Sequence, residues 1–240
     1  PLGLRLLGCI FVYALNCITF GTAIDPAAGS GNFLTETYLS LRRLENEALY
    51  EENHGQMLLG VKGEYNPIQV SIGQFYGIEI NDFAVTVAKT ALWIAESQMM
   101  QETEKLMQIN LNFLPLKSYA NIVEGNALRI DWESVVPKEK LNYIMGNPPF
   151  VGYSLQSKEQ KSDILSIYID EKGKPYKTAG KIDYVAGWYF KATMLMIGTE
   201  IRTAFVSTNS ITQGEQVAGV WKPLYDRFGI HIDFAHRTFR

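Results

Sequence analysis

The stretch that decides the fold is ITFGTAIDPAAGSGNFL, Ile18–Leu34. Its first part, Ile18–Ile24, combines β-branched, aromatic and small residues, which is typical of a buried strand. A turn containing Gly29 and Gly31 follows, and Asn32–Asn46 then carries apolar residues at helical spacing. A strand that passes through a glycine-containing turn straight into a helix predicts the first unit of an α/β fold.

The same alternation of strands and helices continues along the chain. It predicts a doubly wound, mainly parallel sheet with helices on both faces, in which ligands bind at the carboxyl ends of the strands. The further strands expected are Phe75–Ile80, Tyr119–Glu124, Leu141–Met145, Thr203–Thr208 and Ile230–Ala235, and the further helices are Phe83–Gln98 (with Asn81 or Asp82 as N-cap), Tyr184–Ile197 and Gln216–Phe228.

Length and composition limit the possible classes of protein. The chain has 240 residues, of which 47% are hydrophobic, enough for the core of one α/β domain. A net charge of -3 gives no overall footprint of a nucleic-acid-binding surface. Cys9 and Cys17 form no CxxC pair and the three histidines lack metal-ligand spacing, so we expect neither a disulfide framework nor a metal site. Because the sequence starts at Pro1 rather than at methionine, we expect a fragment.

Three segments are expected to stand apart from the regular alternation. Residues 1–17 are interpreted as an N-terminal helix or tail. The apolar run Leu6–Ile24 is long enough for a membrane span, but Asn16 interrupts it and it leads into a strand, so we expect no membrane partner. Residues 47–66 are interpreted as an insertion, and the polar residues 153–181 as a mobile, solvated loop region.

The turn DPAAGSGNFL, Asp25–Leu34, is the first candidate binding site. Gly29 and Gly31 let the backbone approach a ligand closely, and the helix N-terminus behind them favours anionic groups. The turn is not a phosphate loop, because no Gly-Lys-Ser/Thr follows, and it departs from the dinucleotide fingerprint because Leu34 stands at the third small position. Asp25 would repel a pyrophosphate but suits a cationic or hydroxyl-bearing ligand.

Glu79, which ends the second strand in GIEIND (Gly77–Asp82), is the second candidate. An acid at this place can accept hydrogen bonds from both hydroxyls of a ribose. Its separation from Asp25 is 54 residues, against about 20 in the dinucleotide fold, which requires the insertion at 47–66. Alone, Glu79 is equally compatible with a solvated acid; its pairing with Asp25 favours a role in binding.

The third strand end is VEGNAL, Val123–Leu128. Asn126 could bond to the edge of an adenine and Leu128 could pack on its face. Alone, this stretch is an ordinary ending of a strand.

The fourth strand end is YIMGNPPFVGY, Tyr143–Tyr153. Pro148 and Pro149 have a fixed φ and no N–H, so the turn is stiff and presents its carbonyls outward. A simple Pro-Pro turn would not explain an amide at Asn147 on one side and a flat ring at Phe150 on the other.

Taken together, these four strand ends resemble the DNA adenine-N6 methyltransferases that depend on S-adenosyl-L-methionine. The order of motifs is that of the gamma arrangement, and DPAAGSGNFL and NPPF are closest to the large or fused methyltransferases of restriction-modification systems. Ala28 stands where that family usually has cysteine, a change expected to be harmless. Further matching segments are KIDYVAGWYFKA (Lys181–Ala192), AFVSTNSITQGEQV (Ala204–Val217) and IDFAHRTFR (Ile232–Arg240), so the resemblance covers the chain from about Ile18 onward.

The resemblance implies a class I methyltransferase fold, Rossmann-like and of seven-stranded type, and a role for each motif. The Asn147 side-chain oxygen and the Pro148 carbonyl would accept the two N–H groups of the target nitrogen, while Phe150 would stack on a flipped base. The catalytic residues implied are Asn147, Pro148, Pro149 and Phe150, and the cofactor-binding residues are Asp25, Pro26, Ala27, Gly29, Gly31, Asn32, Phe33, Glu79, Ile80, Asn126, Ala127 and Leu128.

Several functions stay open at this point. The same turn serves methyltransferases that act on RNA adenine or on glutamine amides of proteins, and the chain could also be a non-catalytic S-adenosylmethionine-binding module. A dehydrogenase is less favoured because the glycine pattern is imperfect. If the substrate is DNA, a target-recognition domain or specificity subunit is expected outside this chain, in the cytoplasm of a bacterium or archaeon.

Overall fold

A parallel sheet forms the centre of the computed structural model, which describes residues 21–52, 67–108, 111 and 120–235. The described residues contain five strands in the order β3-β2-β1-β4-β5, and every neighbouring pair is parallel. The strands are β1 (Ala23–Asp25), β2 (Phe75–Glu79), β3 (Asn121–Glu124), β4 (Tyr143–Gly146) and β5 (Arg202–Phe205). The doubly wound α/β fold expected from the sequence is confirmed.

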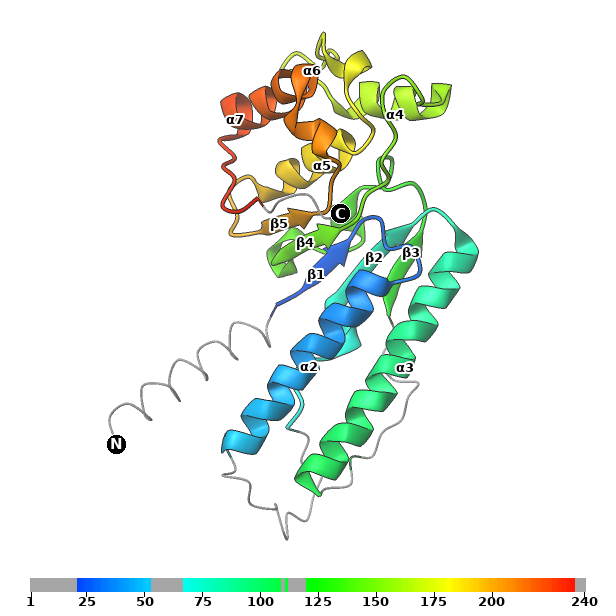
Figure 1. Ribbon diagram of the computed structural model, residues 1–240, viewed down its shortest axis with the longest axis vertical. Helices are drawn as coiled ribbons and strands as arrows, with labels where there is room; N and C mark the ends of the chain where they lie inside the picture. Colours follow the sequence, from blue (N-terminus) through cyan, green and yellow to red (C-terminus); the bar gives the residue numbers. More distant parts are fainter. Residues whose placement is uncertain (1–20, 53–66, 109–110, 112–119, 236–240) are drawn as a thin grey trace, which may run out of the picture.

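The strand order reverses between β1 and β4. The chain runs outward from β1 through β2 to β3 and then returns to place β4 on the other side of β1 (Figure 1). Ala23 pairs with Phe75 on one side and with Tyr143 on the other. In open sheets of this kind, ligands bind at the point where the order reverses, and here this point lies at the ends of β1 and β4.

Each face of the sheet is buried under its own group of helices. Helices α2 (Asn32–Glu52) and α3 (Asp82–Met107) lie side by side along the chain's long axis, and α5 (Ala186–Met196) and α7 (Lys222–Phe228) lie near β4 and β5 (Figure 1). Successive strand residues point to opposite faces, so Ala23 belongs to the core with α2 and α3, whereas Ile24 belongs to the core with α5 and α7.

Helices α2 and α3 are longer than expected, because they continue beyond Asn46 and beyond Gln98. A buried polar network joins α2 to the extension of α3. Arg42, which is fully buried, pairs with Glu45 and donates from Nη2 to Thr103 Oγ1 at 2.7 Å. The Thr103 hydroxyl in turn donates to Asn46 Oδ1 at 2.7 Å. In the extension of α3, Thr103 interrupts the apolar pattern of the sequence because it is polar yet buried with a partner.

The segment 153–181, expected to be a mobile and solvated loop, contains a helix, α4 (Lys158–Ile167). Its start is fixed by a capping box between Ser157 and Gln160, in which each side chain accepts a hydrogen bond from the other residue's backbone N–H. Ile164 is fully buried and Asp163 is 4% exposed. The expectation of a solvated loop is therefore wrong at this helix.

One expected strand ends earlier than predicted, and another does not form. Strand β5 ends at Phe205, and a 3-10 turn over Asn209–Thr212 follows soon after it. Residues 230–235 do not form a strand; they are exposed, apart from the half-buried Ile230, whose N–H bonds to the Leu224 carbonyl. Without a neighbouring strand among the described residues, an apolar run of this length has no ladder to join.

Some of the segments singled out from the sequence lie outside the described residues. The N-terminal segment 1–17, residues 53–66 of the expected insertion, and the first residues of the strand Ile18–Ile24 are outside the described part; residues 47–52 belong to α2. In the part of the chain that the structure describes, no helix is both long enough and apolar enough to span a membrane.

Candidate active site at the carboxyl ends of the strands

The predicted site residues come from the carboxyl ends of four adjacent strands. Asp25 ends β1, Glu79 ends β2, Asn126 follows β3 and Asn147 follows β4. Because the strands are parallel, these ends lie at one edge of the sheet. The Gly125 N–H donates to the Glu79 carbonyl at 2.8 Å, so the ends of β2 and β3 are held together directly.

Glu79 is bonded to the glycine turn. Its Oε2 accepts the N–H of Gly29 at 2.8 Å, and its Oε1 accepts the N–H of Asn81 at 3.0 Å. Each carboxylate oxygen can accept a further hydrogen bond, and the side chain is only partly buried. Glu79 therefore both shapes the turn and keeps acceptors for a hydroxyl-bearing ligand.

The turn itself is pressed against α3 at Gly31. This residue has a φ of +82°, and a Cβ there would lie 2.9 Å from the Cβ of Ala88, so only glycine fits. Asn32 and Phe33 open helix α2 just beyond, and Phe33 is 40% exposed. Helix α3 begins one strand away with the predicted cap, since Asn81 Oδ1 accepts the N–H of Ala84 at 2.9 Å.

Asp25 is a buried acid at the reversal of the strand order. Its side chain is 1% exposed, and Oδ1 accepts the N–H of Ala27 at 2.9 Å. Burial raises the pKa of this carboxyl to about 7; the Ala27 hydrogen bond opposes the rise, and the negative charge of Glu79 adds to it. The carboxylate lies so close to β4 that a Cβ on Gly146 would be 2.3 Å from Oδ1.

The residues after β3 are engaged within the protein. Asn126 accepts the N–H of Leu128 at 2.9 Å and donates from Nδ2 to Asp163 on α4 at 3.0 Å. Leu128 is 3% exposed and lies against Gly187 of α5, in the core, and the Ala127 carbonyl also accepts hydrogen bonds. Ile80, just after β2, is an apolar side chain that is 67% exposed.

The turn after β4 presents its amide to solvent. Asn147, Pro149 and Phe150 are exposed, whereas Pro148 is buried. Among the described residues, no hydrogen bond engages the Asn147 side chain. The Gly146 carbonyl accepts the N–H of Val206, which continues the pairing of β4 with β5 up to the turn.

Three residues at the site were missed from sequence: Asp163, Asp183 and Trp188. Asp163 accepts hydrogen bonds from Asn126, as above, and from the Tyr184 hydroxyl at 3.0 Å. Trp188 donates to the Pro26 carbonyl of the glycine turn at 2.9 Å. For Asp183 and Trp188 the segment KIDYVAGWYFKA was the available signal, because it places an acid and several aromatic residues at the start of a helix; Asp163 lies outside that segment.

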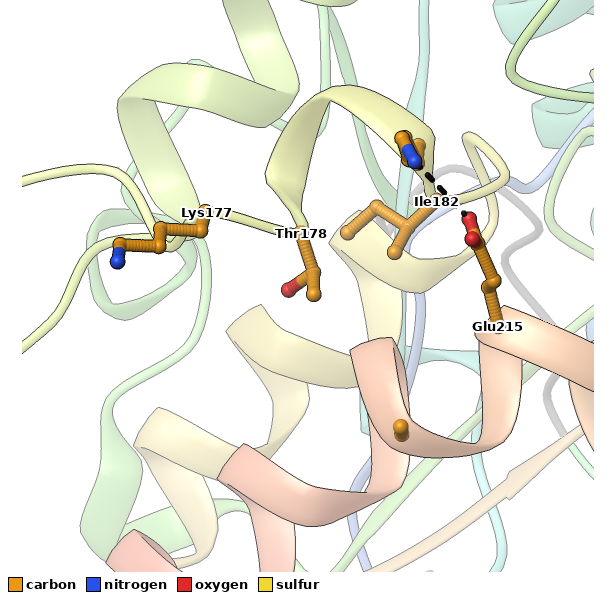
Figure 2. A pocket seen from close by; sticks show the side chains of 6 residues that line it. Lys177, Thr178, Ile182 and Glu215 are labelled. Carbon is orange, nitrogen blue, oxygen red and sulfur yellow. Dashed lines mark ion pairs between the residues drawn. The ribbon is translucent and has the colours of Figure 1, made fainter.

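A hollow of about 240 Å³ lies beside α6 (Gly214–Gln216), with Lys177, Thr178, Ile182 and Ala218 in its lining. Figure 2 shows Glu215 reaching toward a lysine next to Ile182; this is the ion pair of Lys181 and Glu215, whose N–O distance is 3.5 Å. None of the predicted site residues lines the hollow, so it is separate from the strand ends. The described residues also hold no cluster of side chains suited to a metal ion.

Comparison with known proteins agrees with this geometry. Residues 15–240 match the family described as MmeI, DNA-methyltransferase domain. The chain belongs to this family. It is 43% identical over 220 residues to DNA methyltransferase A of Bacillus subtilis (strain 168), which covers 90% of this chain and 24% of that protein. The match to this DNA-methyltransferase domain confirms the family resemblance expected from the motifs.

Solved structures support the same assignment. A DNA complex of the Type IIL restriction-modification enzyme MmeI matches with a TM-score of 0.78 and 40% identity, over 90% of this chain and 28% of that one. DNA-bound LlaBIII, an ATP-dependent Type ISP restriction-modification enzyme, shares only the fold, with a TM-score of 0.50 and 14% identity over 84% of this chain and 14% of that one. This MmeI-family chain spans about a quarter of the length of DNA methyltransferase A and of the MmeI chain in the DNA complex.

Proposed function

We propose that this chain transfers a methyl group from S-adenosylmethionine to the exocyclic N6 of an adenine flipped out of DNA. The observation that carries the proposal is the meeting of a buried acid, a ribose-type acid and an open Asn-Pro-Pro-Phe turn at one edge of the sheet. Membership of the MmeI methyltransferase-domain family supports DNA as the substrate.

The residues present fit the cofactor in kind. Asp25 is a buried carboxylate suited to a cationic group, Glu79 keeps free acceptors for ribose hydroxyls, and Ile80 offers an exposed apolar surface for a ring. Pro26, Ala27, Gly29, Gly31, Asn32 and Phe33 would surround the methionine end, and Asn126, Ala127 and Leu128 would border the adenine end. The bound cofactor would supply a methyl group made electrophilic by a sulfonium.

The chain's own residues would then activate the target nitrogen. The lone pair of adenine N6 is delocalised into the ring, so this nitrogen is a poor nucleophile. Two acceptors, the Asn147 side-chain oxygen and the Pro148 carbonyl, would take its N–H groups and favour tetrahedral geometry. Acceptors of this sort contribute about 3 kcal/mol each to a transition state, by analogy with oxyanion-hole donors. Phe150, 44% exposed, would stack on the flipped base.

Adenine in RNA and the glutamine amide of proteins offer the same planar NH2 group and are the alternative substrates. A chain that binds S-adenosylmethionine without catalysis is a further alternative. DNA is favoured because the match to the MmeI family extends beyond the turn to residue 240. A target-recognition domain or specificity subunit would be a partner outside this chain, in the cytoplasm of a bacterium or archaeon.

Titration calorimetry with S-adenosylmethionine and with NAD tests the cofactor. We expect S-adenosylmethionine to bind and NAD not to bind. Replacing Glu79 with alanine should weaken binding by about 1.5–3 kcal/mol, because a charged acceptor is lost. The exposed Glu139 provides a matched control, and its alanine variant should bind normally. Binding of NAD alone would contradict the proposal.

The affinity for S-adenosylmethionine should depend on pH through Asp25. Because burial raises the pKa of this carboxyl to about 7, a cationic ligand must displace a proton below that pH. We therefore expect affinity to fall as pH decreases from about 8 to 6, by up to about tenfold per pH unit below the pKa.

The variant Asp25→Asn separates binding from folding. Ionising the buried Asp25 costs free energy in the folded chain, which is why its pKa is raised. The protonated acid therefore favours the folded state fully at pH values below its ordinary pKa, and this contribution to the free energy of unfolding decreases as pH rises toward 7. At pH 8 the variant should be at least as stable as the natural chain in urea unfolding, yet bind the cofactor more weakly and without the pH dependence. A variant that keeps the pH dependence would assign it to another group.

A further inference from the structure

Asp183, just before α5, bonds to two separate loops at the candidate site. The side chain is 8% exposed. Its Oδ1 accepts the N–H of Tyr153 at 3.1 Å, three residues beyond Phe150. Its Oδ2 accepts the hydroxyl of Ser210, in the loop after β5, at 2.7 Å. One buried carboxylate thus joins the chain that leaves the Asn-Pro-Pro-Phe turn to the chain that leaves the neighbouring strand.

The residues around Asp183 strengthen this attachment. The N–H of Tyr184 donates to the Val151 carbonyl at 2.9 Å, and Gln156 donates from Nε2 to the Ile182 carbonyl at 2.9 Å. Residues 151–156 are therefore bonded to residues 182–184 at three points. Asp183 is itself held, because its N–H donates to Oε1 of Gln216 at 3.0 Å.

The turn needs such an external attachment for a physical reason. Pro148 and Pro149 have no N–H, so the turn cannot close hydrogen bonds of its own through these two residues. Its position is set by β4 before it and by the first bonded groups after it. Upstream, the Gly146 carbonyl is fixed by Val206. Downstream, the fixed groups are the Val151 carbonyl and the Tyr153 N–H, and Asp183 holds the latter.

We propose that Asp183 is a positioning residue, which holds the Asn-Pro-Pro-Phe turn in the geometry needed for methyl transfer. This inference rests on the proposed function. Asp183 does not touch the reacting atoms; it acts through Tyr153 on the orientation of Asn147. A misplacement of about 1 Å at a reacting group costs on the order of a hundredfold in rate, so a buried two-point attachment matters for catalysis.

The test compares three substitutions at the attachment in the complete natural protein. Asp183→Ala removes both acceptors, and kcat for methylation of an adenine-containing duplex should fall about a hundredfold, with the Kd for S-adenosylmethionine within about twofold. Asp183→Asn can rebuild both bonds, since its oxygen can accept from Tyr153 and its NH2 can donate to the Ser210 hydroxyl, so most activity should return. Ser210→Ala removes one bond and should cost about fivefold.

A second readout, hydrogen exchange of the Tyr153 amide, does not depend on catalysis. It should become faster in Asp183→Ala and stay slow in Asp183→Asn. Asp170→Ala is the matched control, because Asp170 also accepts two hydrogen bonds, but these come from the N–H groups of Lys172 and Lys174 and not from the chain that leaves the turn. This control should change neither kcat nor the exchange of Tyr153.

The outcomes separate the two proposals. An Asp183→Ala variant with ordinary kcat, or an Asp183→Asn variant as impaired as the alanine one, overturns the positioning role. If Asp183→Ala does not fold, Ser210→Ala decides, and unchanged kcat and exchange in that variant overturn the role. A natural protein that does not methylate DNA, yet shows the expected exchange pattern, contradicts the proposed function while the attachment of the turn stands.

Discussion

Replacing Asn147 with alanine is expected to reduce methyl transfer by about a thousandfold while changing the affinity for S-adenosylmethionine less than about twofold. The amide would act on adenine N6 as that nitrogen becomes tetrahedral, and loss of one aligned hydrogen-bonding group of this kind costs about 10²–10³ in kcat. The proposed cofactor contacts come from the ends of β1, β2 and β3 instead. Since the Asn147 side chain has no hydrogen bond among the described residues, its removal should leave stability unchanged.

Single-turnover methylation of an adenine-containing duplex, measured beside cofactor calorimetry, checks this expectation. An interaction made mainly in the transition state lowers kcat and kcat/KM together. Phe150→Ala provides the contrast, because loss of stacking should weaken retention of the flipped base by about 1–3 kcal/mol and affect KM for DNA as well. If Asn147→Ala methylates at an ordinary rate, the turn is structural and the catalytic assignment is wrong.

The sequence was sufficient to locate the five strands of the sheet and the ends of β1 to β4, although the strand expected at Ile230–Ala235 does not form. Buried strands such as Phe75–Glu79 and Tyr143–Gly146 are short apolar runs bounded by glycine or polar residues, which is a local signal. The residues that follow them, Glu79 and Asn147, then lie at one edge because parallel strands all end on the same side. This part of the site needs no knowledge of side-chain packing.

The contacts made by distant residues could not be predicted in this way. Asp163 lies 37 residues from Asn126, and Asp183 lies 30 residues from Tyr153, so neither contact has a local signal. Asp163 also stands in a lysine-rich stretch, which is typical of solvated surface. Asp163 is buried because α4, which carries it, packs on the domain. Likewise Arg42 reads as an exposed helix residue until Glu45 and Thr103 surround it.

The second large effect is expected from the substitution Gly146→Ala, at the position where the strand order reverses. This variant should be destabilised. A Cβ at position 146 would lie 2.3 Å from Oδ1 of Asp25 and 3.0 Å from its Cγ, and the φ of +156° is one that residues with a side chain rarely adopt. Asp25 is 1% exposed and bonded to the N–H of Ala27, so it cannot turn away without breaking that bond. Overpacking of this kind costs about 1–3 kcal/mol.

The same substitution should also abolish most cofactor binding, because the displaced carboxylate is the group proposed to face the cationic end of S-adenosylmethionine. Gly180→Ala is the control: nothing lies within 4 Å of a Cβ there, so stability and binding should stay nearly unchanged. The double variant Gly146→Ala, Asp25→Ala removes the clash and should recover part of the stability but none of the binding. Urea unfolding and calorimetry on the four proteins distinguish these effects. If Gly146→Ala matches Gly180→Ala in both measurements, Asp25 is not locked against β4, and the ends of β1 and β4 do not form one binding site.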